Sequence, residues 1–269
     1  MNNILVRSLS GVLFVAVVIG AFFIGELATG VILGLFMVLG LGEFYRLFID
    51  VEDINPHVVP ALFTALMGYS LLLGNQMGWW YLNPMLVFIP ISFLFYVNIL
   101  REKSRFPVKN LAVTGMGFLY VFLPFSVMLF LYGLNSSNDD WYFLLGLFLI
   151  VWSNDTFAYL TGRFLGKHKL FERVSPKKTW EGTIGGFIFA VLAGGAYAYF
   201  TDHDYLFWVV GAVIISPAAV VGDLIESQLK RTVGVKDSGN IMPGHGGILD
   251  RFDAVMFAAP FFYVWCQIY

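Results

Sequence analysis

Residues 222–253 read GDLIESQLKRTVGVKDSGNIMPGHGGILDRFD, the most polar stretch of a chain that is otherwise strongly apolar. Apolar runs at 205–221 and 254–268 flank it, and we expect both to cross a bilayer as helices. A hairpin of two such helices would hold the stretch at one membrane face. It would also bring Asp223 and Asp250, at the two ends of the loop, towards each other. The stretch therefore predicts a polar loop in an all-α membrane protein.

Acidic residues at this loop are candidates for catalysis and metal binding. Carboxylates near the ends of membrane helices are costly unless they are paired, bind a metal or face water. Ser227 and Lys230 follow Asp223 at spacings that place all three on one helix face, and Asp253 follows Asp250 in the same way. Acidic faces with Lys and Arg between them suit a hard divalent cation such as Mg²⁺ that holds phosphate oxygens. The alternative is a solvated loop with helix-end charges and ordinary glycine turns.

The polar positions of this stretch also follow a recognisable spacing. They are Ser227, Lys230, Arg231, Lys236, Asp237, His245, Gly246, Gly247, Asp250, Arg251 and Asp253. The pattern closely resembles the signature of the phosphatidate cytidylyltransferases, also called CDP-diacylglycerol synthases. Met242 is a conservative departure, since Leu, Ile or Phe is more usual there. The resemblance implies a catalytic role for Asp223, Asp250, Asp253, Lys230 and Arg231, and substrate or phosphate binding by the other positions. His245 is equally compatible with a base, a phosphate contact or a turn residue.

Composition excludes a soluble domain. The chain has 269 residues, of which 58% are hydrophobic, 18% aromatic and only 13% charged. The net charge of −2 and the lack of a basic arm give no indication of a nucleic-acid partner. Cys266 is the only cysteine, so an intramolecular disulfide and a cysteine-based metal site are both excluded.

We expect a single membrane domain, 1–269, with about nine helices, since each crossing needs roughly 20 residues. Five helices fall in 1–140 and four, with the catalytic motifs, in 141–269. The expected helices cover 9–24, 27–48, 58–73, 81–100, 111–134, 141–160, a run that begins near Glu181, 205–221 and 254–268. The first run could also be a cleaved signal peptide, but it lacks a convincing small-x-small cleavage site. Glu43 and Arg46 are three residues apart and are able to pair on one helix face.

The basic residues predict the orientation. With nine crossings, one face would carry Arg7, Arg46 and the loops at 101–109, 163–178 and 230–251. The other face would carry Glu26, Asp139, Asp140, Asp202 and Asp204. Basic loops stay in the cytoplasm. We therefore expect a cytoplasmic N-terminus, an external C-terminus and an active-site cavity at the cytoplasmic face of the cell (inner) membrane.

A second motif lies in the basic loop that precedes Glu181. Residues 175–182 read SPKKTWEG, and two lysines beside hydroxyl groups and a helix start suit phosphate binding. Alternatively, these lysines serve only to keep the loop on the cytoplasmic side of the membrane. The run is similar to a second motif of the same family, so that the resemblance covers about residues 150–255. It implies substrate or phosphate binding by Lys167, Ser175, Lys177, Lys178, Thr179 and Glu181.

Asp155 is the third candidate metal ligand, beside Asp223 and Asp250. We expect it five to seven residues from its helix end, in a polar cavity that it shares with those two residues. A lone charge facing lipid would cost a few kcal/mol. Pairing with a lysine is the structural alternative.

The resemblance implies transfer of CMP from CTP to phosphatidate, which gives CDP-diacylglycerol and pyrophosphate in phospholipid biosynthesis. Mg²⁺ is the expected cofactor, and the sequence leaves open a second divalent or a monovalent cation. The alternatives are a CTP-dependent polyprenol or phytol kinase, which would transfer the γ-phosphate, and an ion-coupled transporter. The glycine-rich helix that begins near Glu181 is compatible with a homodimer.

Overall fold

The computed structural model describes residues 3–49, 51–100, 106–134, 141–242, 244 and 246–269, with side chains from residue 9 onwards. Several sequence predictions fall outside these residues, namely the basic connector at 101–105, the acidic turn at 135–140, the side chain of Arg7, and His245. The chain forms two compact units. The first consists of Met1–Trp141 and Val233–Arg251, and the second of Tyr142–Thr232 and Phe252–Tyr269.

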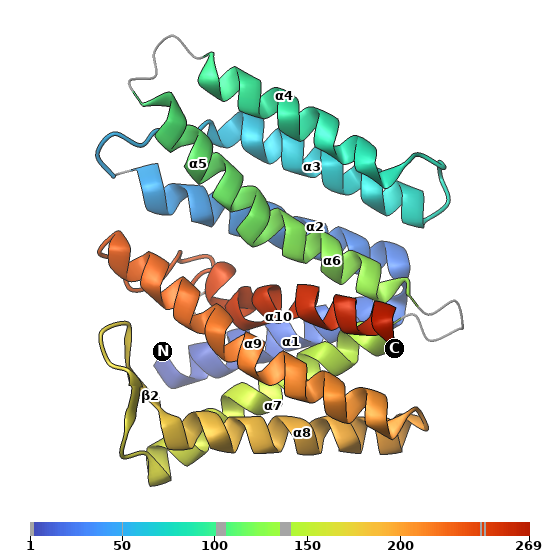
Figure 1. Ribbon diagram of the computed structural model, residues 1–269, viewed down its shortest axis with the longest axis vertical. Helices are drawn as coiled ribbons and strands as arrows, with labels where there is room; N and C mark the ends of the chain where they lie inside the picture. The colour runs from blue at the N-terminus through green and yellow to red at the C-terminus, as the bar shows by residue number, and fades with distance from the viewer. Residues whose placement is uncertain (1–2, 50, 101–105, 135–140, 243, 245) are drawn as a thin grey trace. The chain divides into compact units, whose positions relative to one another are not determined.

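Helices that follow one another in the sequence pack together in the first unit (Figure 1). They are α1 (Asn3–Ile24), α2 (Glu26–Ile49), α3 (Val58–Gln76), the short 3₁₀ turn η1 (Pro84–Val87), α4 (Phe88–Ile99), α5 (Pro107–Gly117), the π turn η2 (Phe118–Phe122) and α6 (Leu123–Tyr132). Only Gly25 separates α1 from α2, and its φ of +134° is a conformation that other residues rarely adopt. The tight reversal between these two helices therefore requires glycine.

A π turn interrupts the longest helical stretch of the first unit. α5, η2 and α6 run on as one apolar stretch of 26 residues, Pro107–Tyr132. Pro124 has no N–H to donate, and a π turn just before it accommodates the missing hydrogen bond. The Tyr45 hydroxyl of α2 donates to the carbonyl of Thr114 at 3.0 Å. This buried hydrogen bond holds α2 against α5.

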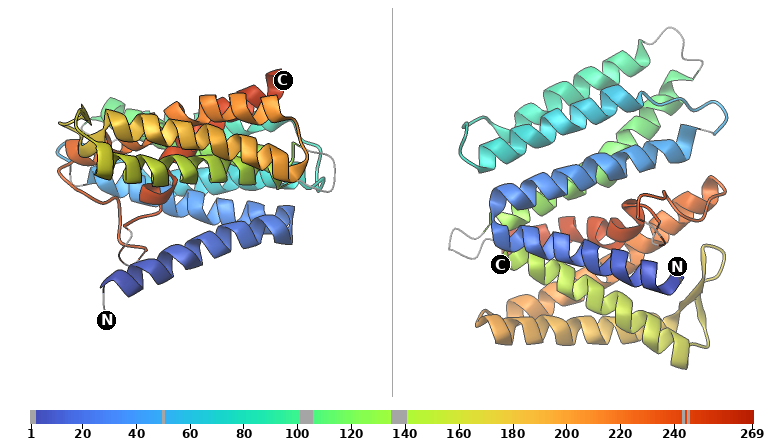
Figure 2. Two further views of the ribbon diagram at one scale, coloured as in Figure 1. Left: turned by 90° about the horizontal axis from the view of Figure 1, so that it is seen from below. Right: turned by 180° about the vertical axis from the view of Figure 1, so that it is seen from behind.

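The second unit contains the helices that carry both motifs. They are α7 (Tyr142–Leu165), α8 (Trp180–Thr201), α9 (Tyr205–Thr232) and α10 (Leu249–Ile268), whose first turn belongs to the first unit. Contacts join α7 to α8 and α8 to α9, and Figure 2 shows these helices side by side. A Cβ added to Gly186 would lie 2.7 Å from the carbonyl oxygen of Asn154. The small residues of α8 therefore allow it to approach α7 closely.

A β-hairpin stands where the sequence predicted a plain basic loop. Its strands are β1 (Lys169–Phe171) and β2 (Ser175–Thr179), paired antiparallel with Lys169 opposite Thr179. Val174 at the turn is buried, and the Lys169 ammonium donates to the Pro176 carbonyl at 2.6 Å. These interactions order a segment that helix and hydropathy patterns alone predict to be irregular.

The expectation of an all-α polytopic membrane protein is confirmed. Among the described residues, six helices are long and apolar enough to cross a membrane, and 9–24 and 84–99 form shorter apolar helices. Large apolar side chains of α8 lie exposed one turn apart, at Ile184, Ile188 and Leu192. Exposed apolar stripes of this kind are expected towards lipid. The exact number of crossings stays a prediction.

Two helix boundaries near the candidate site differ from the sequence prediction. α7 continues to Leu165 rather than 160, so that Asp155 lies ten residues from the helix end and not five to seven. α9 continues to Thr232 rather than 221, so that Asp223 lies within the helix and not at the root of a loop. Polar residues ended the predicted runs because hydropathy falls there, whereas the backbone hydrogen bonds of the helix continue.

Candidate active site

The second motif forms β2 and the start of α8. Thr179 is the N-cap of α8, since its Oγ1 accepts a hydrogen bond from the Gly182 amide at 3.2 Å. The Glu181 carboxylate accepts from the Lys167 amide at 3.0 Å and contacts Nδ1 of His168 at 2.6 Å. Thr179 and Glu181, both predicted to bind substrate, thus have structural tasks in the hairpin. Ser175 and Lys177 lie on the same strand, and Lys177 is exposed.

Lys178 joins the two motifs within the second unit. Its ammonium nitrogen lies 2.6 Å from Oδ2 of Asp223 on α9. Oδ1 of Asp223 accepts a hydrogen bond from the Ser227 hydroxyl at 3.2 Å. Both partners of the ion pair are partly exposed, with 24% and 33% of their side chains accessible. A phosphate that enters here would therefore meet a lysine and a carboxylate that solvent can reach.

Asp155 is held by a polar chain between α7 and α9. The buried amide of Asn154 donates from Nδ2 to Oδ1 of Asp155 at 3.2 Å. The carbonyl oxygen of the same amide accepts from the Ser216 hydroxyl at 2.6 Å. Asp155 itself is exposed, so a ligand can reach its carboxylate.

Asp253 of α10 approaches the same acidic residues. A Cβ added to Gly222 would lie 2.6 Å from the carbonyl oxygen of Asp253, which shows how closely α9 and α10 pack at this level. The carboxylates of Asp223, Glu226 and Asp155 lie close enough for their charges to act on Asp253. This part of the second unit therefore concentrates negative charge.

Lysines pair with acids of this group. Lys230 forms an ion pair with Glu226 one helical turn away, and both side chains are buried. With the Lys178–Asp223 pair, lysines stand against Asp223 and Glu226, two of the acids of this group. Arg231 follows in the last turn of α9 and is exposed.

The donor set fits Mg²⁺ completed by phosphate. Within the described part of the chain, no three His, Cys, Asp or Glu side chains form a group that could hold a metal ion. Mg²⁺ in nucleotide enzymes commonly uses one or two carboxylates together with water and substrate phosphates. The carboxylate oxygens gathered around Asp253 agree with such a site. Asp223 and Asp250 belong to different units, so a metal that they share stays a prediction.

Asp250 stands at the centre of a separate hydrogen-bond network in the first unit. Its Oδ2 accepts from the Ser238 amide at 2.9 Å, the Ser238 hydroxyl at 2.9 Å and the Gly247 amide at 2.7 Å. The signature glycine thus serves as a backbone donor. Arg251 is half-buried beside Asp250, and Gly246 has a φ of +83°.

Asp237, a predicted substrate-binding residue of this loop, lines a hollow. A cavity of about 300 Å³ lies among Arg46, Val51, Asp237, Gly239 and other residues of α2 and the loop. Arg46 and Asp237 give it charges of both signs. Lys236 is exposed next to Asp237.

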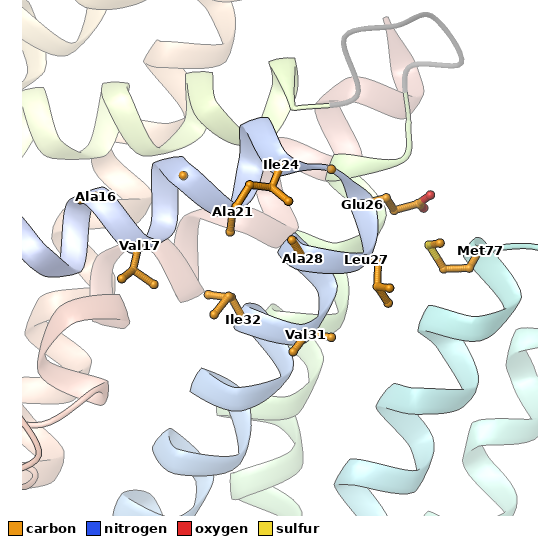
Figure 3. A pocket seen from close by; sticks show the side chains of 12 residues that line it. Ala16, Val17, Ala21, Ile24, Glu26, Leu27, Ala28, Val31, Ile32 and Met77 are labelled. Carbon is orange, nitrogen blue, oxygen red and sulfur yellow. The ribbon is translucent and has the colours of Figure 1, made fainter.

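A larger hollow of about 760 Å³ lies elsewhere in the first unit (Figure 3). α1 and α2 form it together with Met77, and apart from Glu26 the labelled side chains are apolar. Such a lining offers little to a phosphate or a metal ion. We therefore place the candidate chemistry at the two motif clusters and not at this hollow.

Glu43 has partners that lie far from it in the sequence. Its spacing from Arg46 would allow a pair, but the ion pairs of the described residues do not include one. Oε2 of Glu43 instead accepts from the Leu249 amide at 3.0 Å and lies 3.4 Å from the Ser238 hydroxyl. The sequence gives one indication of this role, because Glu43 is an acid within the apolar helix α2. A buried acid on such a helix requires hydrogen-bond donors from elsewhere in the fold.

Comparison with known proteins decides the family. The model of the cytidylyltransferase family matches residues 5–269. The chain is 40% identical over 205 residues to the phosphatidate cytidylyltransferase of Staphylococcus haemolyticus (strain JCSC1435), covering 75% of this chain and 77% of that protein. It is 35% identical over 258 residues to the phosphatidate cytidylyltransferase of Staphylococcus aureus (strain COL), covering 95% and 96% respectively. The chain belongs to the cytidylyltransferase family.

Membership extends well beyond the motifs. The sequence resemblance covered about 150–255, whereas the family match begins at residue 5. The first half of this cytidylyltransferase was missed because apolar helices carry general hydropathy and few residues of distinctive chemistry. Glu43 is an exception, and it contacts the signature loop. The protein is thus an integral membrane nucleotidyltransferase throughout its matched length.

Proposed function

We propose that this cytidylyltransferase transfers CMP from CTP to phosphatidate and releases pyrophosphate. The observation that carries the proposal is the 2.6 Å contact between Lys178 and Asp223, which unites the two family motifs on β2 and α9. The staphylococcal relatives bear the name of this activity. A lysine and carboxylates at one place suit a reaction between two phosphates.

The chemistry needs no side-chain nucleophile, because a phosphate oxygen of phosphatidate is already an anion. It attacks the α-phosphorus of CTP and forms a new P–O bond. The bond between the α-phosphorus and the oxygen that bridges the α- and β-phosphates breaks. The bridging oxygen keeps the electron pair and leaves as part of pyrophosphate. The protein has to align the two phosphates and neutralise charge.

Lysine and arginine side chains supply that neutralisation in our proposal. Lys178 can move from Asp223 to a phosphate oxygen without a long rearrangement, since the pair is partly exposed. Lys177, next to Lys178 on β2, and Arg231, in the last turn of α9, are both exposed. We propose that they add positive charge for binding the triphosphate. Lys230 is buried against Glu226, so we assign it to holding α9 rather than to a direct phosphate contact.

A magnesium ion, when bound, would offset phosphate charge and polarise the α-phosphate. We propose that one or two of Asp223, Asp253 and Asp155 supply its protein ligands, and that substrate phosphate and water supply the others. The proposal rests on their carboxylate oxygens and on the negative charge that surrounds Asp253. Four acids lie in this part of the second unit, Asp155, Asp223, Glu226 and Asp253, so that it could also bind a second divalent or a monovalent cation.

We place the reaction at the cytoplasmic face of the cell membrane, with the N-terminus inside and the C-terminus outside. The proposal is supported by the distribution of Lys and Arg, which lie in every second loop between the expected helices. Basic loops of membrane proteins stay in the cytoplasm. A water-soluble nucleotide and a lipid headgroup can meet at such a surface. A homodimer stays a prediction from the glycine-rich α8.

A labelling experiment tests the function. Purified protein in liposomes that contain phosphatidate receives Mg²⁺ and CTP labelled at the α-phosphate. We expect the label to enter the lipid phase, and a chelator or Asp223→Asn to prevent this. Label that stays in water would overturn the proposal. Transfer of label from γ-labelled CTP to a polyprenol would then favour a kinase, and its absence would favour a transporter.

A further inference from the structure

We propose that Glu43 of α2 is a positioning residue that fixes the Asp250 network of the signature loop. The inference rests on the proposed function in so far as Asp250 acts in catalysis. Glu43 and Ser238 of the loop are 195 positions apart in the sequence. It does not belong to either motif.

Glu43 and Asp250 share a donor. The Ser238 hydroxyl lies 2.9 Å from Oδ2 of Asp250 and 3.4 Å from Oε2 of Glu43. Glu43 also accepts from the Leu249 amide at 3.0 Å, directly before Asp250 in the chain. The carboxylate of Glu43 thus holds both the residue before Asp250 and the serine that contacts Asp250.

Glycines of the loop pack against the Glu43 carboxylate. A Cβ added to Gly247 would lie 2.4 Å from Oε2 of Glu43, and one added to Gly239 would lie 2.4 Å from Oε1. Neither position tolerates a side chain while Glu43 stays in place. Gly247 also donates its amide to Asp250, so the fit of Gly247 on Glu43 sets the position of that donor.

Stability alone does not explain this arrangement. Glu43 is only 2% exposed, and its Oε1 has no hydrogen-bond partner among the described residues. Burying a carboxylate with one oxygen unsatisfied is costly. An apolar residue of similar volume would avoid that cost, but it would accept no hydrogen bond from Leu249 or Ser238. Alignment of the loop is the role that requires the acid.

The consequence concerns Asp250. Three hydrogen bonds from Ser238 and Gly247 hold its Oδ2 and thereby orient the carboxylate towards any cation that it binds. Loss of Glu43 releases Leu249 and Ser238, and the carboxylate of Asp250 can then rotate. The expected defect is misalignment of Asp250 rather than loss of a nucleotide contact.

Hydrogen exchange of the full-length protein in detergent provides the direct test. The variants are Glu43→Gln, Glu43→Ala and Ser238→Ala, and the control is Glu26→Gln at the other end of the same helix. We expect the amides of Ser238, Gly247 and Leu249 to exchange roughly tenfold faster or more in Glu43→Ala, and less so in Glu43→Gln, which keeps one acceptor. Unchanged exchange of these amides in Glu43→Ala would overturn the proposal. If Glu43→Ala does not fold, Glu43→Gln decides, and unchanged exchange of these amides in that variant would overturn the proposal.

Kinetics separate positioning from general damage. In Glu43→Gln we expect kcat to fall roughly tenfold or more while the KM for CTP changes less than about twofold, with Glu26→Gln like wild type. A rise in KM without a fall in kcat would contradict the assignment. A wild-type protein without cytidylyl transfer would sink the proposed function, whereas the exchange data would still decide whether Glu43 holds the loop.

Discussion

The Lys178 ammonium nitrogen lies 2.6 Å from Oδ2 of Asp223, and this ion pair connects the β-hairpin to α9. Each residue belongs to a different motif, separated by more than forty positions in the sequence. Their contact joins the β-hairpin to α9 through a pair of opposite charges.

Lys178→Ala removes the cation of this pair. We expect the KM for CTP to rise roughly tenfold, because a charged hydrogen bond to phosphate contributes about 1.5–3 kcal/mol. Steady-state kinetics with varied CTP measure the effect. Lys109→Ala is the matched control, since Lys109 also pairs with an aspartate, Asp53, at 3.3 Å. An unchanged KM and rate in Lys178→Ala would exclude a role in nucleotide binding.

Asp223→Asn keeps the size of the side chain and an oxygen that can accept from Ser227. It removes the negative charge that faces Lys178 and the proposed cation. We expect turnover to fall by roughly a hundredfold or more, with little change in the melting temperature, and chelation to reproduce the loss in wild type. Near-normal turnover in the variant would refute the assignment of Asp223.

Asp155→Ala tests the acidic residue of α7. Its side chain is exposed and contacts the amide of Asn154, so its loss leaves the buried Asn154–Ser216 bond in place. We expect activity to fall by roughly tenfold or more at an unchanged expression level. A collapse of expression together with normal specific activity would instead identify Asp155 as a structural residue.

Gly222→Ala tests the approach of α10 to α9. The added Cβ would lie 2.6 Å from the Asp253 carbonyl, so the helices have to separate. We expect a loss of about 1–3 kcal/mol in the free energy of unfolding, and a fall in activity because Asp253 moves. Gly20→Ala is the control, since no atom lies within 4 Å of its added Cβ. Equal melting temperatures of the two variants would contradict this packing.

Asp204 makes stability depend on pH at the turn before α9. It accepts hydrogen bonds from the Phe207 amide at 2.8 Å and the Tyr269 hydroxyl at 2.9 Å, and these lower the pKa of its carboxyl below the ordinary 3.8. A carboxyl with a lowered folded-state pKa stabilises the fold above its unfolded pKa, and that contribution is lost as the pH falls. We therefore expect wild type to melt above Asp204→Asn at neutral pH and the difference to shrink below about pH 4. A difference that grows in acid would reverse the assigned sign.

Local patterns determined much of this protein. Hydropathy predicted the runs that form helices and the membrane class, because each depends on neighbouring residues alone. The fixed spacing of residues 227–253 indicated the family, which the comparison confirmed. The contact of Ser227 with Asp223 also followed from spacing, since positions four apart meet on a helix.

Helix ends and partners were less accessible to the sequence. Polar residues lowered the hydropathy of 222–232, although the hydrogen bonds of α9 continue to Thr232. The β-hairpin at 169–179 is too short and too polar for a periodic signal. Lys230 pairs with Glu226, four positions before it on α9. Spacing along the helix alone does not predict which acid the lysine contacts.

The sequence by itself determined that this is a helical membrane cytidylyltransferase with two polar motifs, because helix formation, hydropathy and motif spacing are properties of adjacent residues. Only the tertiary structure decided that Lys178 meets Asp223 and that Glu43 holds Leu249 and Ser238. Such contacts join residues far apart in the chain, and their geometry depends on how whole helices and loops pack. Neither composition nor spacing contains that information.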